Sequence, residues 1–154
     1  MPRRIIDGLE ELRGLIGQEV AVSDWFALRQ EQINAFADVI DDHQWIHVDT
    51  ERARTELPEG KTIAHGFLTL SMLSYLLRES LQIKTQFTQG INYGFNRVRF
   101  PCPVQAGSEI RARCTLQSVA DVQNGIQLGW GVVIEVNGVT KPAVVAEWLV
   151  RYSN

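Results

Sequence analysis

Hydrophobic residues recur along this chain with two different periods, and each period predicts a different kind of element. Between Gln30 and Ile40, apolar residues stand at positions i, i+3, i+4 and i+7, which places them on one face of a helix. They are Ile33, Phe36, Ala37 and Ile40. Arg29 and Gln30 stand where Ser, Thr or Asp would cap a helix, so only the spacing marks its start.

A second helix, expected from near Gly66 to about Leu81, is apolar on nearly all of its surface over the first three turns. Such a helix is buried on most of its sides in a folded protein. Its apolar residues are Phe67, Leu68, Leu70, Met72, Leu73, Tyr75, Leu76 and Leu77. The longest apolar run is about half of what a bilayer-spanning helix needs, and three hydroxyl side chains interrupt it.

In the C-terminal half the period changes to two, which predicts strands. Apolar and polar residues alternate from Ile110 to Gln117, from Leu128 to Val136 and from Val144 to Tyr152. Asn124-Gly125 and Asn137-Gly138 lie between these strands, and Asn-Gly is the dipeptide that best tolerates the positive φ angles of a tight hairpin. We therefore predict an antiparallel meander.

Two further strands are predicted before this meander. The segment from Ile91 to Phe100 is the candidate first strand, and Pro101 and Pro103 end it because proline cannot donate to a ladder. An earlier strand is expected around Glu19 to Leu28. One buried helix and an antiparallel sheet combine most simply when the sheet curls around the helix, so we predict an α+β fold. Apolar residues on both faces of the segment from Ala143 to Leu149 indicate a homodimer.

Composition and charge limit the functions open to this chain. It has 154 residues, 45% of them hydrophobic and 21% charged, which fits a single globular domain over residues 1–154. A net charge of −3 without a Lys/Arg cluster argues against a nucleic-acid partner, and no segment indicates a membrane or a signal peptide. Cys102 and Cys114 are typical of core thiols in a reducing compartment, so we expect a cytoplasmic protein.

The stretch DDHQWIHVD, from Asp41 to Asp49, places three acids and two histidines directly after the first predicted helix. On spacing alone it is either a solvated charged loop or an acid/base site. A histidine suits proton transfer because its ordinary pKa is about 6.5. His43 and His47 also have the spacing of a metal-binding pair, but such a pair needs a helix and a third ligand, so no metal is expected.

Three segments, FADVIDDHQWIHVD, IAHGFLTLSML and NRVRFPCPVQAGSEI, resemble the MaoC-like (R)-specific enoyl-CoA hydratases. The likeness is greatest to the nodulation-protein-N-like branch and its mycobacterial hydratase relatives, and it extends from about Val20 to Tyr152. It implies a hot-dog fold, an antiparallel sheet wrapped around a long central helix. It also implies reversible addition of water to a trans-2-enoyl-CoA, with the coenzyme A thioester as substrate and no separate cofactor.

The resemblance implies roles for individual residues of the charged stretch. The family pattern Gly-Asp-x-Asn-Pro-x-His-x-Asp places the catalytic aspartate on Asp42 and the catalytic histidine on His47. The glycine, asparagine and proline of the pattern are here Asp41, Gln44 and Trp45. Gln44 keeps the amide, whereas the other two replacements change the backbone preferences of the loop.

The segment AHGF and the helix after it supply the other implied contacts. Gly66 matches the glycine whose backbone N–H binds the thioester carbonyl, and the first turn of a buried helix offers such donors. Gln44, His65 and Ser74 are the other implied substrate-binding residues, although helix-start packing also explains His65 and a bond within its own helix explains Ser74. The bulky side chains Phe67, Leu70, Met72, Leu73 and Tyr75 predict short to medium acyl chains.

Two other functions remain open on sequence alone. One is a hot-dog thioesterase that releases the coenzyme A thiol, and the other is a non-catalytic module that binds acyl-CoA. The aspartate and histidine five positions apart favour the hydratase, because a binding module needs no pair that activates water. Arginines on the predicted strands match the phosphates of coenzyme A, but such side chains are usually solvated and none is assigned. They are Arg97, Arg99, Arg111 and Arg113.

Overall fold

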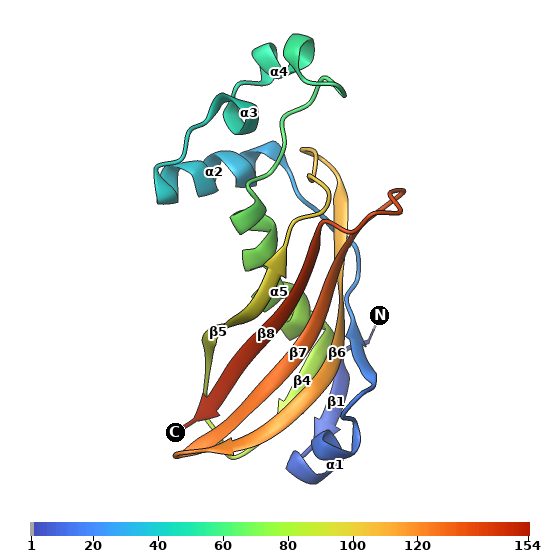
Figure 1. Ribbon diagram of the computed structural model, residues 1–154, viewed down its shortest axis with the longest axis vertical. Helices are drawn as coiled ribbons and strands as arrows, with labels where there is room; N and C mark the ends of the chain where they lie inside the picture. The colour runs from blue at the N-terminus through green and yellow to red at the C-terminus, as the bar shows by residue number, and fades with distance from the viewer. Residues whose placement is uncertain (1) are drawn as a thin grey trace.

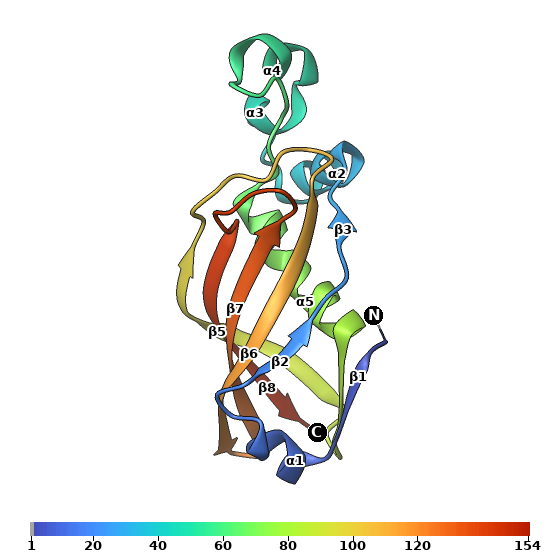
Figure 2. The same cartoon turned by 90° about the vertical axis from the view of Figure 1, so that its right-hand side faces the viewer.

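A computed structural model describes residues 2–154 and shows one curled antiparallel sheet around one long helix (Figure 1). Helix α5 (Gly66–Ser80) lies along the concave side of the sheet (Figure 2). The six-stranded sheet has the order β2-β6-β7-β8-β5, and β3 also pairs with β6. Its strands are β2 (Glu19–Val22), β3 (Phe26–Ala27), β5 (Gln89–Arg99), β6 (Glu109–Val122), β7 (Gly125–Val136) and β8 (Val144–Ser153).

The predicted meander is formed by β6, β7 and β8, and every pairing within this sheet is antiparallel. The predicted strand at Ile91–Phe100 is also present as β5, but its neighbour is β8 rather than the next strand of the chain, with Asn92 opposite Val150. The segment between β5 and β6 crosses one end of the molecule (Figure 2), and within the sheet these two strands are separated by β7 and β8.

The two Asn-Gly dipeptides lie in different connections. Strands β6 and β7 meet in a tight turn where Val122 pairs with Gly125, and the positive φ of 63° falls on Asn124. Gly138 has a φ of 78°, but the connection from β7 to β8 runs from residue 137 to 143. The second dipeptide therefore marks one turn inside a longer loop and not a two-residue hairpin.

The strand expected around Glu19 to Leu28 is divided into β2 and β3. Ser23 is buried between them, and its Oγ accepts a hydrogen bond from the Ala112 N–H at 2.9 Å and donates to the Asp24 carbonyl at 2.9 Å. A side-chain oxygen thus takes one position of the backbone ladder, which interrupts the regular pairing.

An N-terminal unit that no sequence pattern predicted closes one end of the molecule. Strand β1 (Arg4–Asp7) pairs in parallel with β4 (Leu81–Lys84), directly after α5, and helix α1 (Leu9–Gly14) follows β1. Ile6 and Leu12 are fully buried there. Figure 1 shows this unit at the end of the molecule away from α2, α3 and α4.

The opposite end is covered by three helices, α2 (Gln30–Ile40), α3 (Trp45–Val48) and α4 (Thr50–Glu56), of which α2 was predicted. Helix α5 is less enclosed than its apolar sequence predicted. Leu73 and Leu76 lie in the core, whereas the side chains of Phe67 and Tyr75 are exposed in the single chain. Across residues 2–154, no helix combines the length and apolar character that a bilayer crossing requires.

Candidate active site

The site begins where α2 ends, at a residue in the left-handed conformation. Asp41 has φ 56° and ψ 35°, and its N–H bonds to the Ala37 carbonyl. The N–H of Asp42 bonds to the same carbonyl at 3.1 Å. A residue in the left-handed conformation with an N–H bond to the carbonyl four residues earlier ends many helices, and this residue is usually glycine. Asp41 thus adopts, at some cost in backbone energy, a conformation that glycine adopts freely.

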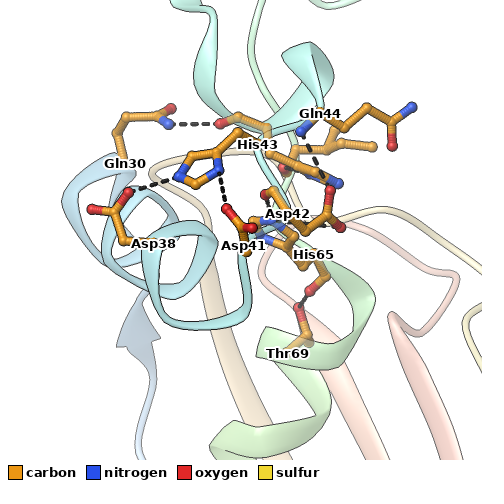
Figure 3. A network of polar contacts seen from close by, with 10 residues as sticks. Gln30, Asp38, Asp41, Asp42, His43, Gln44, His65 and Thr69 are labelled. Carbon is orange, nitrogen blue, oxygen red and sulfur yellow. Dashed lines mark hydrogen bonds and ion pairs between the residues drawn. The ribbon is translucent and has the colours of Figure 1, made fainter.

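Asp42 is held through its backbone while its carboxylate stays accessible. Its carbonyl oxygen accepts a hydrogen bond from His65 Nε2 at 3.0 Å. Its Oδ1 accepts the Gln44 N–H at 3.3 Å, and its Oδ2 lies 4.0 Å from His65 Nε2 (Figure 3). The Asp42 side chain is 48% exposed. The backbone bonds therefore fix the position of a carboxylate that water can reach.

His47 lies on α3 and is buried, with 7% of its surface exposed. Its Nδ1 is 2.6 Å from the Ile63 carbonyl oxygen. Because a carbonyl oxygen only accepts, Nδ1 carries the proton and Nε2 keeps its lone pair. Burial lowers the pKa of His47, the Ile63 bond opposes this, His65 lowers the pKa further and Asp42 raises it. The neutral, basic form of His47 is therefore favoured near neutral pH.

The His65 ring links Asp42 to His47. It stacks on the His47 ring with 3.8 Å between centroids and an interplanar angle of 23°. Since its Nε2 donates to the Asp42 carbonyl, its Nδ1 has the lone pair, and this buried atom has no hydrogen-bond partner within residues 2–154. His65 is thus a packed residue at the start of α5 that contacts both members of the predicted pair.

Gln30 and Thr62 support this site, although neither was predicted. Gln30 Nε2 donates to the His47 carbonyl at 2.7 Å and to Asn34 Oδ1 at 2.9 Å, and its Oε1 accepts the Thr62 hydroxyl. These bonds tie α2 to α3 and to the segment before α5. No local motif marks them, because the two residues are separated by the whole charged stretch.

One ligand-type atom from each of Asp42, His47 and His65 lies within 4.8 Å of the other two. A gap of this size admits one water that bridges a carboxylate and an imidazole. The same three residue types are also able to bind a cation. His43, the other half of the H-x-x-x-H spacing, instead contacts Asp38 and Asp41 (Figure 3).

Gly66 is the first residue of α5, where backbone N–H groups have no partner within the helix. A cavity of about 310 Å³ is lined by Gly66 and His47 together with Thr69, Phe100 and Cys102. A Cβ atom on Gly66 would lie 3.2 Å from the Phe100 ring. The predicted base and the predicted carbonyl-binding glycine therefore line one cavity.

Two of the predicted substrate contacts, Ser74 and Gln44, do not line the cavity that contains His47. Ser74 is about two turns further along α5, and it lines a separate cavity of about 310 Å³ with Leu77, Trp148 and Tyr152. The Gln44 side chain is exposed, and the residue contributes through its backbone, which bonds to Asp42 Oδ1 and to the His47 N–H. The structure thus brings Asp42, His47 and His65 together but not Ser74.

The bulky helix residues expected to limit acyl-chain length do not line the cavity that contains His47. From α5, that cavity is lined by Gly66 and Thr69, as far as the described part of the chain shows. The strand arginines are partly neutralised: Arg111 Nε lies 2.6 Å from Glu135, and Arg113 makes two 2.8 Å bonds to Glu19.

The curled antiparallel sheet around a central helix is the arrangement of the hot-dog fold, and an aspartate–histidine pair lies at the N-terminal end of that helix. A sequence model described as "MaoC like domain" matches residues 11–137, which is more than half of the chain. The chain belongs to the MaoC-like domain family.

Named relatives cover nearly all of the chain. The 3-hydroxyacyl-thioester dehydratase Z of Mycobacterium tuberculosis is 47% identical over 150 residues, which is 97% of this chain and 98% of that protein. Nodulation protein N of Rhizobium meliloti is 42% identical over 142 residues, 92% of this chain and 88% of that protein.

A solved structure shows the same fold. It is an (R)-hydratase from A. caviae involved in PHA biosynthesis, which superimposes with a TM-score of 0.67 at 24% identity over 88% of this chain and 94% of that one. The predicted family and the predicted hot-dog fold are confirmed. The protein is a hydro-lyase of this family.

Proposed function

We propose that this protein is an (R)-specific enoyl-CoA hydratase that reversibly adds water to trans-2-enoyl-CoA and forms (R)-3-hydroxyacyl-CoA. One observation carries the proposal: Asp42 and His47 have side-chain atoms within 4.8 Å, and His47 shares a cavity with Gly66. The names of the dehydratase and hydratase relatives support the reaction class.

In the proposed reaction, Asp42 and His47 hold one water between them. Neutral His47 Nε2 accepts a proton from this water while the water oxygen bonds to the β carbon of the substrate. The electrons of the double bond move toward the thioester carbonyl and form an enolate. When the enolate collapses, the pair delivers a proton to the α carbon, so the net change is one water added across the double bond.

The Gly66 N–H would bind the carbonyl oxygen on which this negative charge develops. Donors at the start of a helix are fixed in direction, and the helix dipole favours negative charge there. The short distance between a Cβ on Gly66 and Phe100 supports this role, because only glycine leaves the approach to this N–H open.

The hydratase is distinguished from the two alternatives by one assay. Enoyl-CoA substrates from four to sixteen carbons are incubated with the protein, and loss of the conjugated double bond and release of free thiol are followed in parallel. We expect absorbance loss without thiol, with kcat/KM highest for short to medium chains because the cavity is small. Thiol release would instead indicate a thioesterase, and binding without either change would indicate a binding module.

We also propose that the protein is a cytoplasmic homodimer in which β5 of one copy meets a second copy. Strand β5 pairs only with β8 among the described strands, and it exposes Ile91, Tyr93 and Phe95. An exposed apolar edge of this kind is a ready site for pairing with another chain. Light scattering at micromolar concentration should give twice the mass of one chain, and a monomeric mass would contradict the dimer.

A further inference from the structure

The backbone of Asp41, beside the candidate active site, is in an energetically costly conformation. It is the residue directly before Asp42, and its φ of 56° is a conformation that L-residues other than glycine adopt at a cost. If Asp41 returned to an ordinary conformation, the chain direction would change and the Asp42 carboxylate would move. A contact that holds the Asp41 side chain would therefore favour its left-handed form.

His43 makes two side-chain contacts that meet this need. Its Nε2 lies 2.8 Å from Asp38 Oδ1, in the last turn of α2, and its Nδ1 lies 3.5 Å from Asp41 Oδ1 (Figure 3). One ring thus joins the end of the helix to the left-handed residue after it. The bond to Asp38 raises the pKa of His43, which favours the imidazolium form with donors on both nitrogens.

His43 has no direct place in the proposed proton transfer. The three residues whose atoms lie within 4.8 Å of one another are Asp42, His47 and His65. The His43 side chain is 47% exposed and faces the end of α2 instead. Its contacts act on the backbone before Asp42 and not on a water between Asp42 and His47.

We propose that His43 is a positioning residue: by bridging Asp38 and Asp41 it stabilises the left-handed conformation of Asp41 and so fixes the place of the Asp42 carboxylate. The link to catalysis rests on the hydratase function proposed above. The link to backbone conformation does not, because it concerns Asp41 and the Asp42 amide alone.

The test uses glycine to replace the contact. His43→Ala should lower kcat about two- to fivefold at unchanged KM, the range expected when an exposed ion pair is lost. Asp41→Gly adopts the left-handed conformation without help, so the double variant Asp41→Gly/His43→Ala should have the kcat of Asp41→Gly alone. A double variant as slow as His43→Ala, or a His43→Ala variant with unchanged kcat, would overturn the proposal.

Asp121→Asn is the matched control. The pair of Arg13 and Asp121 also has a 2.8 Å contact, and its side chains are 40% and 81% exposed, close to the 47% and 76% of His43 and Asp38. It lies in α1 and β6, away from the site. We expect no change in the kcat of Asp121→Asn. If kcat fell as much in Asp121→Asn as in His43→Ala, the loss in His43→Ala would not depend on the location of His43 beside Asp41, and the proposal would fail.

Hydrogen exchange of the Asp42 amide gives a readout independent of turnover. This amide bonds to the Ala37 carbonyl, so exchange should be faster in His43→Ala and return to the Asp41→Gly rate in the double variant. If the wild-type protein hydrates no enoyl-CoA, the proposed function fails and the exchange rates alone decide the positioning claim. Unchanged exchange in His43→Ala would then overturn it.

Discussion

The two sides of the site differ in how much water surrounds them. On the loop side, the side chains of Asp41, Asp42 and His43 are 98%, 48% and 47% exposed. On the helix side, His47, His65 and Thr69 are buried. Burial has lowered the pKa of His47, whereas about half of the Asp42 side chain is accessible to solvent. One side thus supplies a carboxylate that solvent can reach, and the other supplies a base whose pKa depends on the protein interior.

Substitution on each side tests this contrast most strongly. Asp42→Asn and His47→Gln should each lower kcat by about two to four orders of magnitude, because either change removes one of the two proton-transfer groups. Only His47→Gln should also reduce the free energy of unfolding, by about 1 kcal/mol, since the half-buried Ile63 carbonyl loses the Nδ1–H donor of His47. Steady-state kinetics and denaturant unfolding measure both quantities. Full turnover in both variants would exclude the assigned pair.

Gly66→Ala tests the buried side without removing a titratable group. The new Cβ would lie 3.2 Å from the Phe100 ring and obstruct the cavity. We expect kcat/KM to fall about ten- to a hundredfold, in the range of losing one oxyanion donor or less. Gly14→Ala in α1 is the control, because nothing lies within 4 Å of its added Cβ. Equal kcat/KM in the two variants would mean that the substrate does not approach Gly66.

The smallest expected effect is a shift in the pH at which kcat/KM falls on the acid side of the pH profile. Because the pKa of His47 is lowered, its basic form persists below pH 6.5, and kcat/KM should fall only as the pH drops through that lowered value. His65→Gln keeps an N–H donor toward the Asp42 carbonyl but removes one cause of the lowering. The acid limb should therefore move to higher pH in this variant. A limb that moves to lower pH would contradict the electrostatic role of His65.

Local sequence patterns predicted the elements whose residues are neighbours in the chain. The period of 3.6 located α2, a nearly continuous apolar run located α5, and the period of two located β6, β7 and β8. The pattern failed where a partner is remote: four residues of β1 carry no signal for pairing with β4, and Ser23 interrupts a strand through Ala112. The stacking of His65 on His47 was not predicted for the same reason, because these residues are remote from each other in the sequence.

Residue matching located the site but not all of its geometry. The resemblance named Asp42, His47 and Gly66, and the structure brings them together around one end of α5, while their catalytic roles stay a prediction. Ser74 lines a different cavity. The sequence did not predict this, because the apolar pattern of a helix that is apolar on nearly all sides does not show which side faces the cavity. The left-handed conformation of Asp41 was equally hidden, since aspartate is not the residue that usually marks it.

The pairing of β1 with β4 has a consequence for the order in which the molecule assembles. Arg4 lies opposite Leu81, so the first strand of the chain has no partner until everything through α5 has been synthesised. Closing so long a loop is entropically costly and slows folding. We expect the Ile6 amide to gain protection late in refolding, after the β6–β7 hairpin, and pulsed hydrogen exchange would detect the reverse order. During translation, the residues of β1 would thus be made well before the strand with which they pair, and they would be among the last to become ordered.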